Sequence, residues 1–187
     1  MKRGLIFTIV LNMLLLFAPN SVSATESKSA FSAFVDKKGT ISLPKDFRKT
    51  MSHLGSWFVP LGDASGFHDV YARQTDISAY RKTGKFPDGA ILVKELRASS
   101  AADYSTGQNV SFANTNIKQW FVMIKDTKNR FPKNKNWGDG WGWALFKTDN
   151  PDLNVSKNYK ADCLGCHLPA KANDWIYIEG YPTLTKQ

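Results

Sequence analysis

The sequence contains few of the side chains that bind zinc most often, because only two Cys and three His occur among its 187 residues. A zinc site needs more Cys or His ligands close together, whereas His53 and His68 lie far in sequence from both cysteines. Internal repeats, low-complexity tracts and dense basic runs are absent as well, although 25 basic residues outnumber 16 acidic ones. The composition therefore argues against a zinc site and against a nucleic-acid-binding protein.

Long apolar runs are also absent, apart from one near the N-terminus. Two basic residues precede an apolar run over residues 5–17, and small residues follow at 22–24. This order is typical of a secretory signal peptide, and the run is shorter than the ~20 residues that span a bilayer as an anchor. We expect residues 1–24 to be cleaved, leaving residues 25–187 as a single exported domain without a membrane span.

Both cysteines fall in one short motif, Cys163-Leu164-Gly165-Cys166-His167. C-x-x-C-H is the attachment signature of c-type haem. On a helical turn the two thiols reach the vinyl groups of one haem edge, and the following histidine is placed to bind the iron. A disulfide is the competing interpretation in an exported chain, but no thioredoxin-like βαβ frame surrounds the pair. We predict one covalent haem c per subunit, attached through Cys163 and Cys166, with His167 as the metal ligand.

Methionine is missing where an electron-transfer cytochrome would need it. Small cytochromes of that kind carry the motif near the N-terminus and an axial Met downstream, but here no Met follows His167. After the signal peptide only Met51 and Met123 remain. A late motif without such a ligand predicts an iron with an open position for a small molecule, and a plain electron carrier is the weakest interpretation.

Hydrophobic alternation and turn residues predict a sheet. Six Trp, six Tyr and twelve Phe favour a β-rich core or a pocket for a large planar ligand. Residues 98–116 are polar, and we expect either a loop or a long hairpin connection there. Strands are expected over residues 56–61, 67–73, 90–97, 118–125, 141–146 and 175–178.

Helices are expected in three short segments. Pro44 opens one over residues 45–53, with Gly55 as its stop. Thr75 and Asp76 cap a second over residues 77–82, and Ser156 caps a third over residues 159–167, which Pro169 terminates. The predicted fold class is α+β: a mainly antiparallel β-sheet domain with short helices and a C-terminal haem-binding helix.

The ordered set of motifs resembles the cytochrome P-460 family, which includes cytochrome P-460 and cytochrome c′-beta. The resemblance implies an antiparallel-sheet homodimer in the bacterial periplasm, with one five-coordinate c-type haem in each subunit. It covers nearly the whole mature domain, through residues 34–47, 80–96, 124–126, 163–167 and 181–182.

The resemblance draws attention to Lys94. In cytochrome P-460 a lysine is joined covalently to the haem macrocycle and the enzyme oxidises hydroxylamine, and by position within Val-Lys-Glu-Leu that lysine resembles Lys94. Strand alternation independently places Lys94 on the face of Leu92 and Leu96. An apolar surrounding lowers the pKa of the amine and makes it nucleophilic. The alternatives are an ordinary solvated lysine, or a lysine packed near haem without a bond.

Two further positions decide between functions. His68 aligns with an arginine of hydroxylamine-oxidising members, and a neutral imidazole there is a candidate proton relay; the alternative is a histidine satisfied by backbone partners. Phe121 occupies the place of a glutamate and resembles the apolar distal pocket of cytochrome c′-beta, or is simply core. Asp69, Tyr71 and Arg73 are nearby groups that would restore polarity.

Two functional hypotheses follow. The first is a hydroxylamine-oxidising haem enzyme, with Lys94 and His68 as catalytic residues, Phe121 beside the haem, and electrons leaving to a redox partner such as a cytochrome. The second is a cytochrome c′-beta-like protein that binds nitric oxide without hydroxylamine turnover. In both, a small hydroxylamine or nitrogen-oxide ligand binds opposite His167.

Overall fold

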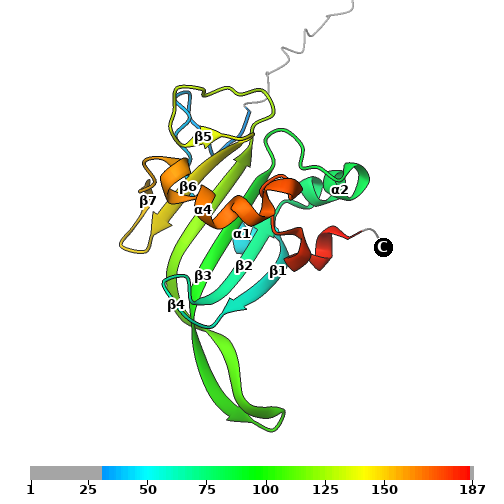
Figure 1. Cartoon of the computed structure of the whole chain (residues 1–187), viewed down its shortest axis with the longest axis vertical. Coiled ribbons are helices and arrows are strands. Elements are labelled where there is room, and N and C mark those ends of the chain that lie inside the picture. The colour runs from blue at the N-terminus through cyan, green and yellow to red at the C-terminus, as the bar shows by residue number, and fades with distance from the viewer. Residues whose placement is uncertain (1–30, 186–187) are drawn as a thin grey trace, which may run out of the picture.

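The structure, a computed structural model, describes residues 31–185, so the predicted signal peptide lies outside the described residues. One antiparallel sheet of seven strands forms the centre of this part of the chain (Figure 1). Its strands are β1 (Ser52–Val59), β2 (Gly66–Ala72), β3 (Ile91–Tyr104), β4 (Gly107–Lys125), β5 (Trp137–Gly138), β6 (Trp141–Lys147) and β7 (Asn150–Asn154). They pair in the order β1-β2-β3-β4-β6-β5, and β7 also pairs with β6.

The helices are short and lie outside the sheet. They are α1 (Phe47–Thr50), α2 (Gln74–Thr83), α3 (Tyr159–Asp162), α4 (Leu164–His167), and the 3-10 helices η1 (Leu168–Asn173), η2 (Ile178–Gly180) and η3 (Pro182–Leu184). Within residues 31–185, none of them is both long and apolar enough to cross a membrane. The predicted α+β class with a mainly antiparallel sheet is confirmed.

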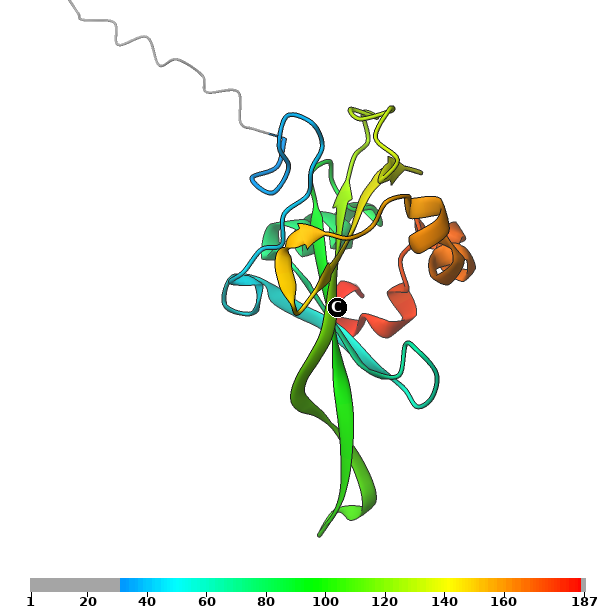
Figure 2. The ribbon, with the colours of Figure 1, turned by 90° about the vertical axis from the view of Figure 1, so that its left-hand side faces the viewer.

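The chain covers the two faces of the sheet with different segments. Figure 2 shows the N-terminal segment, in blue, on one side of the sheet and the C-terminal helices, in orange and red, on the other. Ile41, Leu43 and Phe47 pack with Val93 and other residues on the first face. The second face packs against Tyr159, Trp175, Ile176, Tyr181 and Leu184. The C-terminal segment therefore covers the face of the sheet that carries the predicted site residues His68, Lys94 and Phe121.

The polar stretch over residues 98–116 is a long hairpin, the second of the two alternatives that its sequence allowed. β3 and β4 remain paired as far as Tyr104 and Gly107. The hairpin projects well beyond the rest of the sheet (Figure 1), and Tyr104 and Phe112 form an exposed aromatic pair near its end, with ring centroids 6.1 Å apart. Polar side chains suit this arm because both of its faces meet solvent.

The helix predicted over residues 45–53 is wrong in its second half. α1 ends at Thr50 and β1 begins at Ser52, where pairing with Ala72 of β2 replaces helical hydrogen bonds. Gly55 does not stop a helix; a Cβ there would lie 1.9 Å from the carbonyl oxygen of Gly180. The glycine is needed because the C-terminal segment crosses β1 at this point.

The strand predicted over residues 175–178 is also wrong. Asp174 and Trp175 both adopt left-handed backbone conformations, with φ of 58° and 68°. Each such residue costs about 1–3 kcal/mol and persists where surrounding contacts determine it. The chain turns sharply here and then enters η2, so Trp175 and Ile176 are buried by packing rather than by strand pairing.

The helix expected over residues 159–167 is divided into two. α3 ends before Cys163, whose φ of −128° and ψ of −45° interrupt the helical path, and α4 carries the rest of the motif. Asn158, not Ser156, caps α3 by accepting a hydrogen bond from the amide of Lys160. Pro169 changes the helix type, since η1 continues through it. The single helix expected over residues 159–167 is therefore replaced by two one-turn helices, α3 and α4.

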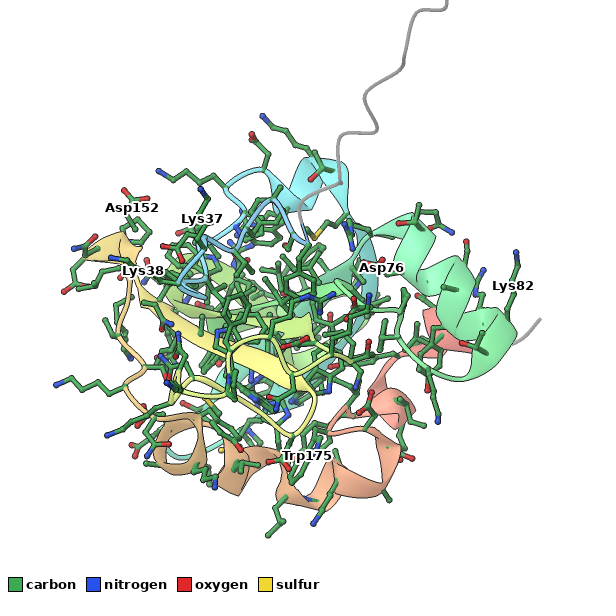
Figure 3. The ribbon with its side chains drawn as sticks, turned by 90° about the horizontal axis from the view of Figure 1, so that it is seen from above. Lys37, Lys38, Asp76, Lys82, Asp152 and Trp175 are labelled. Atoms are coloured by element: carbon green, nitrogen blue, oxygen red, sulfur yellow. The ribbon has the colours of Figure 1, made fainter. Side chains whose placement is uncertain are left out.

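The helix predicted over residues 77–82 is confirmed as the longer α2, which ends at Gly84 with φ of 74°. The buried carboxylate of Asp76, labelled in Figure 3, ties this helix to the sheet. It accepts hydrogen bonds from Arg73 Nε at 2.7 Å and from the amide of Ile91 at 3.2 Å. The predicted cap is corrected: Asp76 lies inside the helix, and Arg73 occupies the N-cap position.

Candidate functional site

A cavity of about 580 Å³ lies between the sheet and the C-terminal segment. Its size falls within the ~300–1,000 Å³ typical of small-molecule and cofactor sites. Four cross-strand neighbours cross its floor in one row, namely Val70, Lys94, Phe121 and Leu145. Because alternate residues of a strand share a face, the same registers bring His68 and Trp143 to the cavity as well.

Lys94 faces this cavity, as the alternation of β3 predicts. Leu92 and Leu96 line the cavity beside it, whereas Glu95 is buried on the opposite face against Arg48. Burial lowers the pKa of the Lys94 amine to about 8. Within residues 31–185 its ammonium makes no ion pair, and it lies 4.0 Å from the centroid of the Phe121 ring. Near pH 8 a substantial fraction of Lys94 is therefore unprotonated, and the neutral amine in the cavity is a nucleophile.

His68 is 5% exposed, and a single hydrogen bond holds its ring. Nε2 donates to the carbonyl oxygen of Ala64 at 2.7 Å, while the ring stacks on Trp57 with centroids 5.2 Å apart. This tautomer leaves Nδ1 unprotonated, and Nδ1 is buried without a hydrogen-bond partner. Burial lowers the pKa of His68, and the positive charges of Lys94 and Lys118 lower it further. The imidazole is therefore a neutral proton acceptor in the cavity wall.

The C-x-x-C-H residues line the cavity from the side opposite the sheet. Cys163 is half-buried, and burial raises the pKa of its thiol to about 11. Cys166 is exposed on α4, and Tyr177 donates its hydroxyl hydrogen to the Cys166 carbonyl. The two thiols and His167 thus lie on one short segment that faces Lys94 across the cavity.

The ring of His167 is held in one orientation, with one nitrogen free of hydrogen bonds. Its Nδ1 donates to the carbonyl oxygen of Trp175 at 2.7 Å, which fixes the tautomer and leaves the lone pair on Nε2. Burial lowers its pKa to about 4, so the ring is neutral. The Trp143 ring contacts it edge-on at 5.0 Å, and Tyr177 packs at 5.9 Å. The ring orientation is therefore set before any iron binds.

The three groups proposed to restore polarity do not reach the cavity. Asp69 and Tyr71 alternate with the cavity-facing residues of β2, so they lie on the other side of the sheet. Asp69 accepts a hydrogen bond from Ser56 there, and Tyr71 packs on Phe47 at 5.0 Å. Arg73 is held by Asp76 and by the carbonyl oxygen of Gly89. The sequence spacing left the placement of these three candidates open, and none of them lines the cavity.

Sequence reasoning missed other polar residues in the cavity wall. Gln119 accepts a hydrogen bond from Lys147, and both line the cavity. Asp63 lines it from the exposed loop that also carries Ala64. Strand alternation could have predicted Gln119, since it lies two residues from Phe121 on β4 and therefore shares its face. Asp63 was not, because its loop is irregular.

These residues fit a haem. The cavity is largely apolar, it lies between two thiols and the sheet face that carries Lys94, and one neutral histidine has its lone pair free of the hydrogen bond to Trp175. In the described part of the chain no cluster of three or more Cys, His, Asp or Glu residues is arranged to hold a metal ion. A haem brings its ring nitrogens to the iron, so one protein ligand with two thiols is the donor set that it requires.

Comparison with known proteins agrees with this site. The family model described as Cytochrome P460 matches residues 44–178, which is more than half of the chain. The matched range includes the whole sheet, Lys94 and the C-x-x-C-H motif. A search of the curated proteins found no match. The chain belongs to the cytochrome P460 family and is a haem cytochrome.

Proposed function

We propose that this protein is a periplasmic mono-haem enzyme that oxidises hydroxylamine. The observation that carries the proposal is the pair of basic groups on the cavity face opposite His167: the amine of Lys94 and the unpaired Nδ1 of His68. Export rests on the N-terminal sequence pattern, and the proposed haem attachment rests on Cys163 and Cys166.

His167 would bind the haem iron, and hydroxylamine would bind in the part of the cavity lined by Lys94, His68 and Phe121. Haem c, when bound, supplies a redox-active iron that accepts electrons from the substrate. The protein orients the groups around the iron. The Trp175 carbonyl holds the His167 ring, and Phe121 and the neighbouring apolar side chains exclude water from the part of the cavity across from His167. A small, neutral substrate suits a pocket of this character.

His68 is the proposed proton acceptor. Each N–H or O–H bond of hydroxylamine that breaks releases a proton to the protein and an electron toward the acceptor. Nδ1 of His68 takes the proton, since its ring is held in the acceptor tautomer by Ala64. Asp63, exposed at the cavity edge, is a carboxylate through which the proton reaches solvent.

Lys94 is the proposed site of a further covalent bond to the haem macrocycle. Its lowered pKa, lack of an ion-pair partner in the described chain and place in the cavity support this role. Forming the bond replaces an N–H and a ring C–H by a C–N bond, so an electron pair and two protons must leave. An external two-electron oxidant, dioxygen or a peroxide, is required for that step.

A redox protein is the proposed electron acceptor. Trp143 contacts His167 and stacks on Tyr159 with centroids 5.8 Å apart, so aromatic rings lead from the site toward the surface. Tyr159 also lines a second pocket of about 280 Å³, whose charged lining residues are Lys133, Lys135 and Lys160. Because these three side chains are cationic, an acidic cytochrome suits this surface.

A homodimer is the proposed assembly, supported by the family resemblance. The projecting hairpin of β3 and β4 offers Tyr104 and Phe112 as exposed apolar side chains. Sedimentation velocity on the holoprotein tests this; a monomer at micromolar concentration would argue against it.

The second candidate is a cytochrome c′-beta-like protein that binds nitric oxide. The placement of Phe121 favours it, because its aromatic ring lies where a polar side chain would assist hydroxylamine chemistry. The ammonium of Lys94 also packs on this ring at 4.0 Å. In that case the cavity binds a diatomic ligand and releases it unchanged.

One experiment separates the two functions. We expect the purified holoprotein to have a red-shifted Soret band, a second peptide joined to haem through Lys94, and hydroxylamine-dependent reduction of an acceptor. Lys94→Arg keeps the charge and serves as the control that removes the bond. An ordinary c-type spectrum with the Lys94 peptide free, together with nitric oxide binding and no turnover, would establish the second function instead.

A further inference from the structure

The carbonyl that holds His167 belongs to an unusual piece of backbone. Trp175 accepts the hydrogen bond from His167 Nδ1 at 2.7 Å. Asp174 and Trp175 are consecutive non-glycine residues with positive φ. Left-handed conformations at such residues persist only when other contacts impose them. The orientation of the Trp175 carbonyl therefore depends on whatever fixes Asp174.

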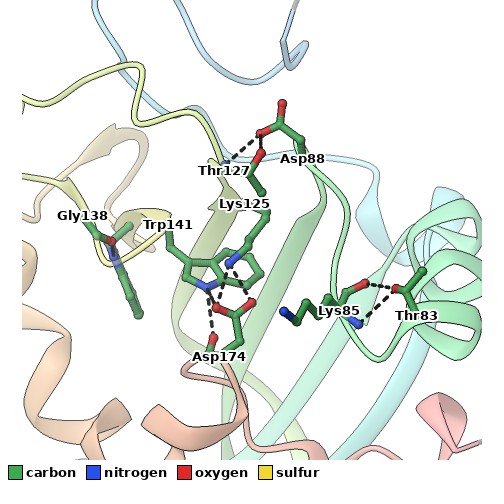
Figure 4. Close-up of polar contacts among 9 residues, drawn as sticks. Thr83, Lys85, Asp88, Lys125, Thr127, Gly138, Trp141 and Asp174 are labelled. Atoms are coloured by element: carbon green, nitrogen blue, oxygen red, sulfur yellow. Dashed lines mark hydrogen bonds and ion pairs between the residues drawn. The ribbon is translucent and has the colours of Figure 1, made fainter.

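An ion pair to the sheet fixes Asp174. Lys125, the last residue of β4, is 8% exposed, and its Nζ donates to both carboxylate oxygens of Asp174 at 2.7 Å (Figure 4). The two residues are separated by 49 positions in sequence, so this contact ties the C-terminal segment to the centre of the fold. The lysine side chain is buried and the Asp174 side chain is half-buried, and a charge-assisted contact to both carboxylate oxygens restrains the position of each partner.

Trp141 completes the contact from the neighbouring strand. Its indole Nε1 donates to the backbone carbonyl of Asp174 at 3.0 Å, and Lys125 Nζ lies 4.7 Å from the centroid of its ring. Trp141 and Lys125 are cross-strand partners in the β4–β6 ladder. Figure 4 shows Lys125 and the Trp141 indole converging on Asp174 from the sheet. Both the side chain and the backbone of Asp174 are thus held.

We propose that Lys125 and Asp174 act as a positioning pair that sets the hydrogen bond between the Trp175 carbonyl and His167, and through it the electron donation of His167 to the haem iron. The proposal rests on the proposed role of His167 as the axial ligand. Neither residue lines the cavity, so the pair acts through the backbone and is not catalytic.

The physical consequence is a change in ligand basicity. A strong hydrogen bond from Nδ1 gives the imidazole more anionic character and strengthens its bond to iron. It also favours the oxidised iron, because a more basic ligand stabilises the higher charge. Loss of the ion pair frees residues 174–175 to relax, and the carbonyl then moves away from His167.

Substitutions at Asp174 test the proposal at two strengths. Asp174→Asn removes the charge but keeps an acceptor for Trp141 and tolerates positive φ. Asp174→Gly accepts the same φ and removes the side chain completely. Lys125→Met removes the other partner. The matched control is Arg130→Met, which removes the contacts that Arg130, on the loop after β4, makes with Asp88 and Asp126.

Two readouts are taken on the holoproteins: the Fe–His stretching frequency of the ferrous form by resonance Raman, and the midpoint potential. We expect the frequency to fall and the reduction equilibrium constant to rise about tenfold for Asp174→Gly and Lys125→Met, which is ~59 mV for one electron. Asp174→Asn should show a smaller change in the same direction. Arg130→Met should retain the parent values, although it also loses an ion pair.

The proposal is overturned if Asp174→Asn and Asp174→Gly both retain the parent frequency and potential. It is equally overturned if Arg130→Met changes them as much, because the effect would then be one of general stability. A parent protein without an Fe–His band, together with unchanged iron coordination in His167→Gly, would instead refute the axial role of His167.

Discussion

At the scale of single residues, the chemistry of the cavity depends on which nitrogen of each histidine is free. A backbone carbonyl fixes the tautomer in both cases: Ala64 for His68 and Trp175 for His167. Nδ1 of His68 and Nε2 of His167 are consequently both lone-pair atoms. Two histidines of the same protonation state thus suit different roles, one as a proton acceptor and the other as a metal ligand.

Substitution of His68 tests its role as proton acceptor. We expect His68→Leu to slow hydroxylamine oxidation about a hundredfold, because general-base catalysis contributes roughly 10²–10⁴-fold, while the haem spectrum is retained. The control is His53→Leu, since His53 lies on β1 outside the cavity and bonds to Ser56. Initial rates of hydroxylamine consumption give the measurement, and an unchanged rate for His68→Leu would contradict the relay.

At the scale of elements, the C-terminal segment approaches the sheet so closely that one glycine of β1 becomes essential. We expect Gly55→Ala to destabilise the protein by about 1–3 kcal/mol, as overpacking does, because its Cβ would lie 1.9 Å from the Gly180 carbonyl oxygen. Gly107→Ala is the control, where the nearest atom is a Val110 methyl at 3.7 Å. Urea unfolding followed by fluorescence measures both, and equal midpoints would contradict the close contact.

The loop that follows β4 is held by an ion pair whose contribution depends on pH. Hydrogen bonding to Arg130 lowers the pKa of Asp88 from 3.8 to about 2. A carboxylate with a lowered pKa in the folded state stabilises the protein above pH ~4, and this stabilisation is lost as pH falls toward 2. Figure 4 shows the same carboxylate accepting hydrogen bonds from Thr127.

We therefore expect the free energy of unfolding to decrease between pH 4 and pH 2 in the parent, and Arg130→Met to reduce this slope. Denaturant titrations at several pH values measure it. Asp152→Asn serves as the control, because the Lys45–Asp152 pair is exposed and exposed pairs contribute little. A parallel pH profile for Arg130→Met and the parent would show that other carboxylates dominate the acid transition.

At the scale of the whole molecule, the sheet separates an N-terminal layer from a C-terminal layer, and only the second encloses the cavity. The N-terminal segment completes one hydrophobic core, and the C-terminal segment encloses the cavity on the other face (Figure 2). The basic pocket around Tyr159 is lined by residues of both layers, since Trp137 belongs to the first core and Tyr159 to the second. Figure 3 shows Lys37 and Lys38 on the side of the view opposite Lys82. The carbonyl oxygen of Lys38 accepts a hydrogen bond from Asn134, which lines the basic pocket.

Charge reversal in the basic pocket tests the proposed partner. We expect the triple change of Lys133, Lys135 and Lys160 to Glu to slow electron transfer to a small acidic cytochrome at least tenfold at low salt. The difference should shrink at high ionic strength, where screening weakens the attraction between the proteins. Stopped-flow oxidation of the haem gives the second-order rate constant.

The matched control makes the same change in net charge elsewhere, through the exposed residues Lys49, Lys82 and Lys85. This variant should retain most of the parent rate constant. Equal slowing in both triple variants would show that overall charge, and not this pocket, attracts the partner.

The sequence by itself determined what depends on local order. C-x-x-C-H predicts haem because three groups lie within one turn of chain, and alternation predicts the inward face of Lys94 because a strand has a period of two. The same rule also holds for Phe121, which lies beside Lys94 across the sheet. The family assignment followed from such motifs taken in order.

Only the tertiary structure decided which distant groups meet. The carbonyl behind His167 comes from a turn whose sequence resembles a strand, and the lysine that fixes that turn is 49 residues away from it. The structure likewise decided that the face of β2 with His68, and not the face with Asp69 and Tyr71, meets the cavity. Local periodicity specifies a face and a conformation, but contacts between remote segments depend on packing the whole chain, and backbone strain at Asp174 and Trp175 is stable only after that packing is complete.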